Sequence, residues 1–129
     1  EEVASFQAPF FPKSDSEIEF IKKSLQKNFM FTSLSERQLS TILRAFGKVE
    51  IPWGKQVIQQ GDEGDYFYVI REGDLHYEID GVMVNSASVG QSFGELALLY
   101  TSPRSASVIA DTDCVLYRVR LFYTSPIPR

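Results

Sequence analysis

Chemically suggestive residues gather between positions 93 and 107 of the 129-residue chain. Gly94 and Glu95 stand directly before the apolar run 96–99, and Arg104 follows the glutamate by nine positions. Glycine lets the backbone approach a ligand closely, and the first N–H groups of a helix attract anions. An arginine adds a planar fork that matches phosphate oxygens. Since Glu95 would repel a phosphate, its carboxylate suits a sugar hydroxyl, and the pair predicts one small ligand with an anion and a sugar diol.

In a simpler interpretation, Glu95 and Arg104 form a surface salt bridge, which would be worth little energetically. A second motif favours the ligand-binding interpretation over the salt bridge. Residues 57–70 read VIQQGDEGDYFYVI and are followed closely by a Glu-Gly pair at 72–73. Together the two segments resemble cyclic nucleotide-binding domains, most of all the regulatory subunits of cAMP-dependent protein kinase. The resemblance covers about residues 29–119.

The resemblance implies a role for each residue of this segment, which in that family is called the phosphate-binding cassette. Glu95 is expected to bind the ribose 2′-hydroxyl, and Arg104 to pair with the cyclic phosphate. Backbone N–H groups around positions 94, 96, 97 and 106 would complete the cradle. The expected ligand-binding residues are Phe93, Gly94, Glu95, Leu96, Ala97, Arg104, Ser105 and Ala106.

The resemblance also implies a function in signal transduction. We expect a cyclic-nucleotide sensor that regulates a protein kinase catalytic subunit through a ligand-induced conformational change, which requires unequal affinity for two conformations. The alternatives are a sensor for cGMP or another nucleotide in a kinase, channel or exchange factor, and an interaction domain that binds no nucleotide.

The choice of base depends on Ser105. Relatives selective for cAMP usually carry alanine directly after the cassette arginine, whereas cGMP-dependent kinases carry a threonine whose hydroxyl meets the guanine amino group. Serine also offers a hydroxyl that can accept from that group. Because the surrounding residues resemble the cAMP kinase family, we expect cAMP as the ligand, with cGMP as the alternative.

No catalytic or metal site is expected, because the sequence shows no nucleophile and base pair and no metal-binding cluster. The carboxylates of Asp62, Glu63 and Asp65 lack the calcium-loop spacing. We expect them to serve turn chemistry, with Gly61 and Gly64 supplying backbone freedom. The prediction is therefore a non-enzymatic domain without a cofactor.

Three further residues are interpreted as structural. His76 is the only histidine, and a lone strand histidine is usually structural or exposed. Cys114 is the only cysteine and lies in an apolar run, which predicts a small buried hydrophobic residue. Trp53 could stack on a base but precedes the cassette by a long way, so an aromatic lid over the base is not identified.

The composition is typical of one soluble globular domain, with 43% hydrophobic residues. A net charge of −4 argues against nucleic acid as a partner. No apolar run approaches the roughly 20 residues of a membrane helix, and no signal peptide pattern opens the chain, so we expect a cytoplasmic protein without a membrane partner.

Two helices are predicted before the strands. The first begins where Ser14 and Glu17 have capping-box spacing, and the second where Ser35 and Gln38 repeat it. The apolar face of the first helix comprises Ile18, Ile21, Leu25 and Phe29, and that of the second comprises Leu39, Ile42, Leu43 and Phe46, with Gly47 ending the helix. The run Lys22-Lys23-Ser24 only poorly imitates a pseudosubstrate and is expected on a solvated helix face.

From residue 49 the pattern alternates as strands do. The dipeptide Asp80-Gly81 between two apolar runs predicts a two-residue hairpin. Seven or eight short antiparallel strands indicate an α+β fold, a jelly-roll-like barrel flanked by helices and interrupted by the short cassette helix, which is also what the resemblance implies.

The predicted organisation is a single domain over 1–129. It comprises a helical part at 1–47, a β-barrel at 48–119 with the cassette at 93–107, and a divergent tail at 120–129. Relatives continue there into helices that move on ligand binding, whereas Pro126 and Pro128 prevent a long helix here. Phe122 or Tyr123 is the candidate for a substitute lid over the base.

Overall fold

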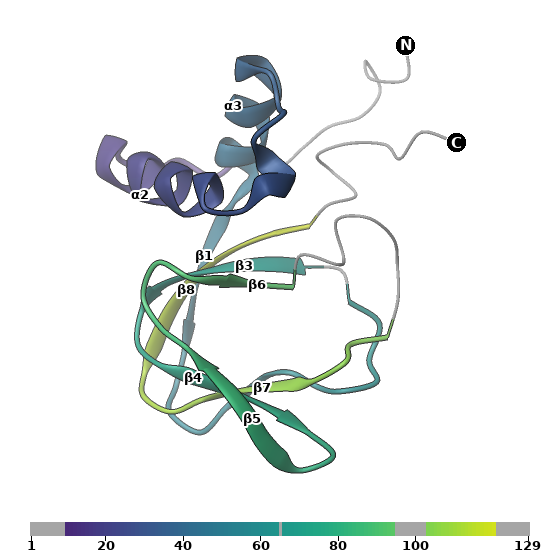
Figure 1. Ribbon diagram of the computed structural model, residues 1–129. Coiled ribbons are helices and arrows are strands. Elements are labelled where there is room, and N and C mark those ends of the chain that lie inside the picture. Colours follow the sequence, from purple (N-terminus) through teal and green to yellow (C-terminus); the bar gives the residue numbers. More distant parts are fainter. Residues whose placement is uncertain (1–9, 65, 95–102, 121–129) are drawn as a thin grey trace.

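The computed structural model describes residues 10–64, 66–94 and 103–120. Helical elements come first, and strands of two sheets follow (Figure 1). The elements are α2 Asp15–Gln26, η1 Phe29–Phe31, α3 Glu36–Ala45, β1 Gly47–Ile51, β2 Gln56–Ile58, β3 Tyr66–Glu72, β4 Leu75–Ile79, β5 Val82–Ala87, β6 Ser92–Phe93, β7 Ser107–Ala110 and β8 Cys114–Arg120. Within the described residues, no helix has the length and apolar character needed to cross a membrane.

Both predicted capping boxes start helices. The Ser14 Oγ accepts from the Glu17 N–H at 3.1 Å, and the Glu17 Oε1 accepts from the Ser14 N–H at 2.9 Å. Ser35 and Gln38 repeat the arrangement at 3.1 and 2.9 Å. Each box satisfies backbone donors that the first helical turn leaves open, so the starts of α2 and α3 follow directly from the sequence.

The predicted ends of the two helices are wrong in detail. α2 ends at Gln26, because the Asn28 side chain accepts from the Met30 N–H at 3.0 Å and starts the short η1 instead. Phe29 therefore leaves the apolar face of α2 and is 84% exposed. α3 ends at Ala45, where Phe46 turns to an extended conformation, and Gly47 opens β1 rather than ending the helix.

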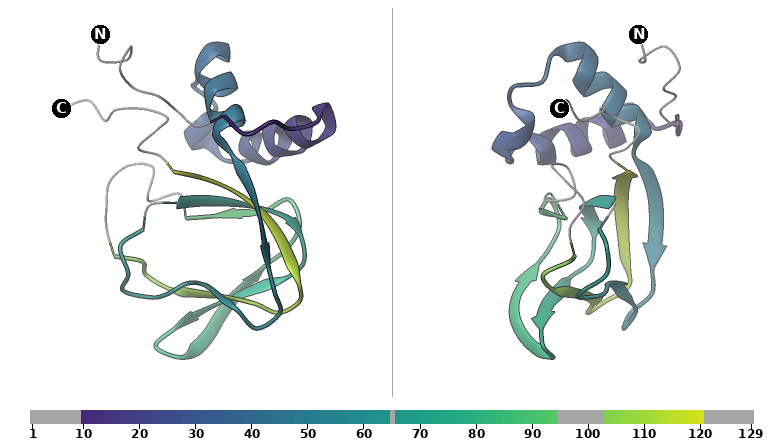
Figure 2. Two further views of the ribbon diagram at one scale, coloured as in Figure 1. Left: turned by 180° about the vertical axis from the view of Figure 1, so that it is seen from behind. Right: turned by 90° about the vertical axis from the view of Figure 1, so that its right-hand side faces the viewer.

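In the part of the chain that the structure describes, the strands form two four-stranded antiparallel sheets, ordered β1-β8-β3-β6 and β2-β7-β4-β5. The sheets face one another across a shared core, and helices lie beyond the first of them (Figures 1 and 2). The Asp80-Gly81 hairpin is confirmed, with φ values of 52° and 82°. The predicted α+β fold is thus confirmed, although the strands of the predicted jelly-roll-like barrel form two separate sheets among the described residues.

Alternation along β3 and β8 separates two hydrophobic clusters. Phe67 and Val69 of β3 face the helices together with Tyr117 of β8, whereas Tyr68 and Ile70 face the space between the sheets. The central strands are therefore buried on both faces, which accounts for their almost continuous apolar sequence.

Helix α2 is also tied to the sheets by hydrogen bonds. The Tyr117 hydroxyl donates to the Glu17 Oε2 at 3.1 Å, and the Ser24 Oγ donates to the Gly90 carbonyl at 2.9 Å. Ser24 is only 3% exposed. The run Lys22-Lys23-Ser24 thus lies on a helix whose serine is buried against the segment between β5 and β6 and is not presented to a partner.

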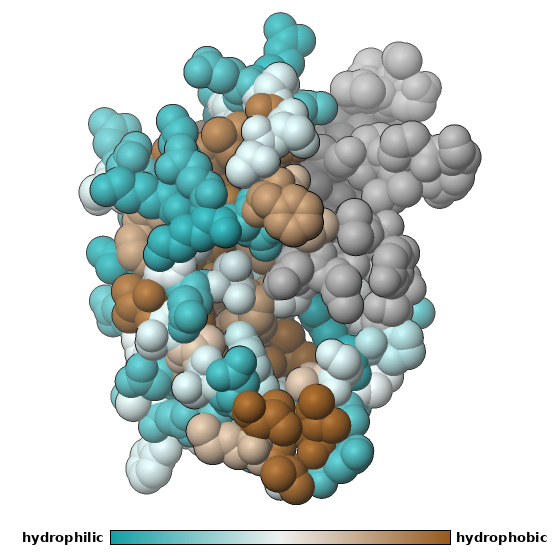
Figure 3. Space-filling view, in the orientation of Figure 1, coloured by the Kyte–Doolittle hydropathy of each residue, from teal (hydrophilic) through white to brown (hydrophobic). Residues whose placement is uncertain are grey.

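Strand β5 lies at the edge of its sheet and carries exposed hydrophobic residues. Val82, Met83 and Val84 are each more than half exposed. The space-filling view shows hydrophobic side chains gathered at the end of the molecule where the β4–β5 hairpin projects (Figure 3). Of β5, only Ala87 reaches the core, so the hairpin extends beyond the packed part of the sheets.

Candidate functional site

The structure describes five of the eight predicted ligand-binding residues. Phe93, Gly94, Arg104, Ser105 and Ala106 are described, whereas the predictions for Glu95, Leu96 and Ala97 fall outside the described residues, as do those for Asp65, Phe122 and Tyr123. Gly94 and Arg104, ten positions apart in sequence, lie against one another, since a Cβ built on Gly94 would be 3.0 Å from the Arg104 Nη1. The two ends of the cassette therefore meet.

The backbone of Arg104 is fixed by the loop between β2 and β3. The Arg104 N–H donates to the Asp62 carbonyl at 2.7 Å, and the Gly61 N–H donates to the Arg104 carbonyl at 2.9 Å. An antiparallel bridge joins Glu63 to Pro103. The two sequence motifs, at 57–70 and 93–107, are thus held together by main-chain bonds. Asp62 contacts Arg104 through its main-chain carbonyl. Asp62 itself is exposed, which agrees with the role in a turn that we expect for it.

The side chain of Arg104 is directed by backbone groups. Its Nη2 donates to the Tyr66 carbonyl at 2.7 Å, at the first residue of β3. The guanidinium is half-buried and lies against the main chain at Gly64 and Gly94. A planar cation with several donors is therefore held at the point where β6 ends and the cassette begins, which suits an anionic ligand.

Gly94 shows the conformation that a close backbone approach requires. Its φ is 92°, and a Cβ at this position would lie 2.8 Å from the Tyr66 carbonyl oxygen. Gly61 likewise has a φ of 91°. Gly64 is different, because it is not among the positive-φ residues, so the prediction that it supplies backbone freedom is wrong.

Phe93 packs into the core between the sheets. Its ring stacks on Tyr68 with centroids 4.9 Å apart and meets Tyr77 edge-on at 6.2 Å. It is 5% exposed. Phe93 also pairs with Tyr68 in the β3–β6 ladder, so its contribution is to anchor the strand that leads into Gly94.

Tyr66 was not predicted as part of the site, yet three arginines surround it. Besides the Arg104 bond to its carbonyl, the Arg118 Cζ lies 4.4 Å and the Arg120 Cζ 5.5 Å from the centroid of its ring. These contacts place positive charge around the start of β3 in a chain of net charge −4. A signal for these two arginines was present in the sequence. Arg118 and Arg120 continue the alternation of Cys114 and Leu116, which face the space between the sheets, so they could have been expected on the same face of β8.

Ser105 is exposed and forms no hydrogen bond among those described, whereas Ala106 is partly buried. The neighbouring Ser107 has a structural role, since its Oγ accepts from the Gln60 N–H at 2.9 Å. The Ser105 side chain thus lies at the surface, next to a serine that is tied into the fold.

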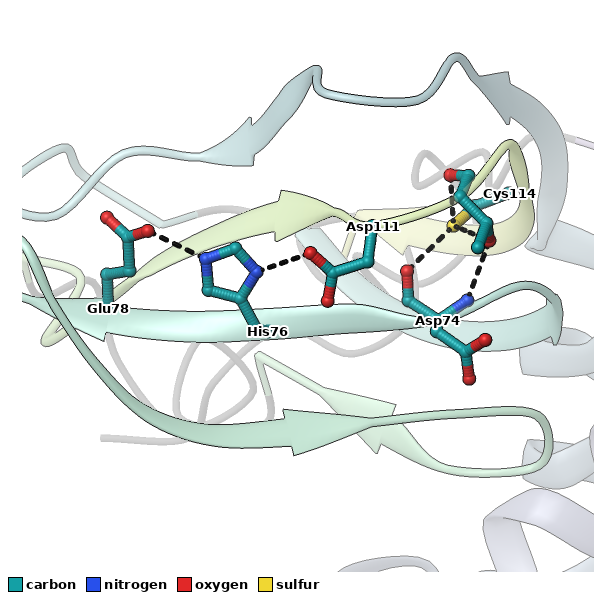
Figure 4. A network of polar contacts seen from close by, with 6 residues as sticks. Asp74, His76, Glu78, Asp111 and Cys114 are labelled. Atoms are coloured by element: carbon teal, nitrogen blue, oxygen red, sulfur yellow. Dashed lines mark hydrogen bonds and ion pairs between the residues drawn. The ribbon is translucent and has the colours of Figure 1, made fainter.

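His76 lies in a separate polar cluster on the second sheet (Figure 4). Its Nδ1 is 2.7 Å from Asp111 Oδ1, and its Nε2 is 2.7 Å from Glu78 Oε2. The hydrogen bond to Glu78, followed by that to Asp111, raises the pKa of the imidazole above its ordinary value. The structural role predicted for this histidine agrees with these contacts.

Cys114 is a buried residue beside the β7–β8 turn. Its Sγ donates to the carbonyls of Asp74 at 3.5 Å and Thr112 at 3.2 Å (Figure 4). Burial raises the pKa of the thiol. A thiol held in its neutral form is a poor nucleophile. The contacts of His76 are with carboxylates and not with Cys114, and in the described part of the chain no cluster of His, Cys, Asp and Glu could hold a metal ion.

Comparison with known proteins identifies relatives by sequence. Residues 48–121 match the cyclic nucleotide-binding domain family. The chain is 43% identical over 104 residues to the cAMP-dependent protein kinase regulatory subunit of Yarrowia lipolytica, which covers 81% of this chain and 28% of that protein. The chain thus spans less than a third of the length of this relative.

Solved structures show the same fold. The regulatory domain of Toxoplasma gondii PKA in co-crystals with cAMP has a TM-score of 0.78 and 33% identity, covering 87% of this chain and 44% of that one. The fold is also similar to a variant of the regulatory subunit of a cAMP-independent protein kinase A from Trypanosoma brucei, bound to cAMP in its A site. The TM-score is 0.81 and the identity 31%, and the match covers 92% of this chain and 44% of that one. With more than half of its residues matched to the family and the cassette arginine held beside its glycine, this chain belongs to the cyclic nucleotide-binding domain family.

Proposed function

We propose that this domain binds cAMP and that the bound nucleotide regulates a protein kinase catalytic subunit in the cytoplasm. The observation that carries the proposal is the Arg104 guanidinium, held on the Tyr66 carbonyl beside Gly94. The domain acts by binding, without catalysing a reaction.

Arg104 would pair with the cyclic phosphate, because a guanidinium matches phosphate oxygens with two parallel N–H donors. Because Gly94 has no side chain, the Arg104 guanidinium lies directly against the main chain at this point. The nearby Arg118 and Arg120 favour a negative group electrostatically. Glu95 would bind the ribose 2′-hydroxyl. Backbone N–H groups around Leu96, Ala97 and Ala106 would complete the phosphate cradle.

The residue types around Arg104 support cAMP. The Trypanosoma brucei variant bound to cAMP carries an introduced alanine, an introduced arginine seven positions later, and an introduced alanine directly after that arginine. This chain has Ala97 seven positions before Arg104, and Ser105 directly after it. Two of the three positions therefore match in type at the same spacing. The third, Ser105, supports a second candidate ligand, cGMP, because its exposed hydroxyl can accept from a guanine amino group.

Regulation requires that the nucleotide favour one conformation over another. The Ser24–Gly90 hydrogen bond joins α2 to the segment that leads through β6 into Gly94. If the cassette moves when it binds phosphate, β6 and Gly90 would transmit the displacement to Ser24 of α2. We propose this connection as the route from the ligand to a bound catalytic subunit.

Calorimetric titration with cAMP, cGMP and 5′-AMP tests the binding part. The proposal predicts a single site that prefers cAMP and that binds 5′-AMP at least tenfold more weakly. Preference for cGMP would favour the second candidate, and no binding of either cyclic nucleotide by the folded chain would contradict the proposal. The regulatory part is tested by retention of a cAMP-dependent protein kinase catalytic subunit on the immobilised chain, which added cAMP should release.

A further inference from the structure

Gly64 lies in the loop between β2 and β3 and is buried. A Cβ built on it would be 2.4 Å from Arg104 Nε, 2.6 Å from Cζ and 2.9 Å from Cδ, closer than real Cβ contacts. Because these are the atoms of the guanidinium and its stem, the Arg104 side chain passes directly over the Gly64 main chain. The space that a side chain at position 64 would need is filled by Arg104.

Gly61 provides the contrast within the same loop. Its φ of 91° calls for glycine, but a Cβ there would have nothing within 4 Å. Gly64 has the opposite properties, with no positive φ and no room. The two glycines thus serve different physical needs, conformation at position 61 and space at position 64.

We propose that Gly64 is a positioning residue for Arg104. With no side chain at position 64, the stem of the arginine lies flat on the main chain and its Nη2 reaches the Tyr66 carbonyl at 2.7 Å. A guanidinium placed before the ligand arrives loses less freedom when it binds an anion. Gly64 therefore sets the affinity of the site for the cyclic phosphate, an inference that rests on the function proposed above.

The first test is a double-mutant cycle on cAMP affinity. Gly64→Ala should lower the affinity by about tenfold or more, the cost of misplacing one charged hydrogen-bonding group. In an Arg104→Lys background the same change should cost about twofold or less, because a flexible lysine stem can pass around the new methyl group. Gly54→Ala, in the β1–β2 turn, is the control for a glycine replacement that strains the backbone without meeting Arg104, since Gly54 has a φ of 85° and nothing within 4 Å of a Cβ. An equal loss in both backgrounds would overturn the proposal.

The second test needs no nucleotide. The NMR signal of the Arg104 Nε–H group, assigned by its loss in Arg104→Lys, should move in Gly64→Ala and stay in place in Gly54→Ala. An unchanged signal in Gly64→Ala would overturn the proposal. If the wild-type chain binds no cAMP, the proposed function fails, while this signal still decides whether Gly64 positions Arg104.

A variant that does not fold is also informative. If Gly64→Ala unfolds the domain, the double variant with Arg104→Ala should fold, because the arginine no longer occupies the space of the new methyl group. A double variant that also fails to fold would show a role of Gly64 independent of Arg104 and would overturn the proposal.

Discussion

Two parts of this molecule hold a basic side chain in different ways. His76, on the second sheet, has a carboxylate oxygen 2.7 Å from each ring nitrogen. Arg104 lies before β7, and its side chain reaches the start of β3, where it donates to a main-chain carbonyl and lies against two glycines. Two carboxylates hold the histidine, whereas the contacts described for the arginine include a main-chain carbonyl and close packing on two glycines. The first arrangement serves the fold, and we propose that the second presents a cation to a ligand.

Arg104→Ala tests the ligand-binding side of this comparison with the largest expected effect. The affinity for cAMP should fall by about 100-fold or more, because a charged fork to the phosphate is lost. The thermal unfolding temperature should change little, since Arg104 is half-buried and outside both hydrophobic clusters. Calorimetry and thermal melting measure the two quantities. Binding that survives unchanged would remove Arg104 from the site.

Ser105→Ala sharpens the account of base choice. Removing the hydroxyl should shift the ratio of cAMP to cGMP affinity toward cAMP by about tenfold, the value of one hydrogen bond to a buried ligand group. Parallel titrations of the two nucleotides give the ratio. Ser105→Thr keeps a hydroxyl and serves as the control. A ratio that is the same in all three proteins would show that this side chain does not contact the base.

His76→Gln tests the structural side. The free energy of unfolding should fall by about 1 kcal/mol, because glutamine keeps polar contacts but cannot carry the charge. The affinity for cAMP should stay within about twofold of the wild type, since the hydrogen bonds described for His76 lead to Glu78 and Asp111. Chemical denaturation and calorimetry provide the measurements. A large loss of affinity with unchanged stability would reverse the roles assigned to the two regions.

The pH dependence of stability gives a finer test of the same cluster. Hydrogen bonds to Glu78 and then Asp111 raise the pKa of His76 in the folded chain. Its stabilising contribution is therefore complete below the unfolded value of about 6.5 and is lost as the pH rises through the folded pKa. The stability difference between wild type and His76→Gln should shrink as the pH rises from about 6.5 through the folded pKa of His76. A difference that grows over this window would contradict the assigned charge.

The pKa of Glu17 is shifted in the opposite direction to that of His76, so Glu17 affects stability at acidic pH. Its pKa is lowered, first by the Ser14 N–H and then by the Tyr117 hydroxyl and Lys48, so its contribution is lost as the pH falls through the folded pKa. Denaturation of Glu17→Gln should thus differ from the wild type near neutral pH and converge with it in acid, separately from the His76 window. Convergence toward alkaline pH would contradict this assignment.

The fold was largely predictable because its signals are local. A capping box at Ser14 or Ser35 needs only four residues, and the Asp80-Gly81 hairpin needs two with positive φ. The end of α2 was not predictable in the same way, because the Asn28 side chain accepts from the Met30 N–H and so competes with the helix for a backbone donor. Such competition between a short polar side chain and the helix is hard to weigh from periodicity alone.

The candidate site was predictable only in part. Arg104 and Gly94 were found from residue types and spacing, and the structure brings them together. The roles of Gly64 and the Tyr66 carbonyl could not be predicted, since neither space beside a distant side chain nor a main-chain acceptor leaves a mark on residue type. For the same reason, the partnership of His76 with Asp111, 35 residues away, appeared only in the structure.

The most direct test of the central claim is a crystal structure of the chain with cAMP bound. The account predicts the cyclic phosphate within about 3 Å of the Arg104 guanidinium, the usual distance of a charge-assisted hydrogen bond. Arg104 should still lie on Gly64 in that complex. A nucleotide bound elsewhere, with its phosphate remote from Arg104, would contradict the account.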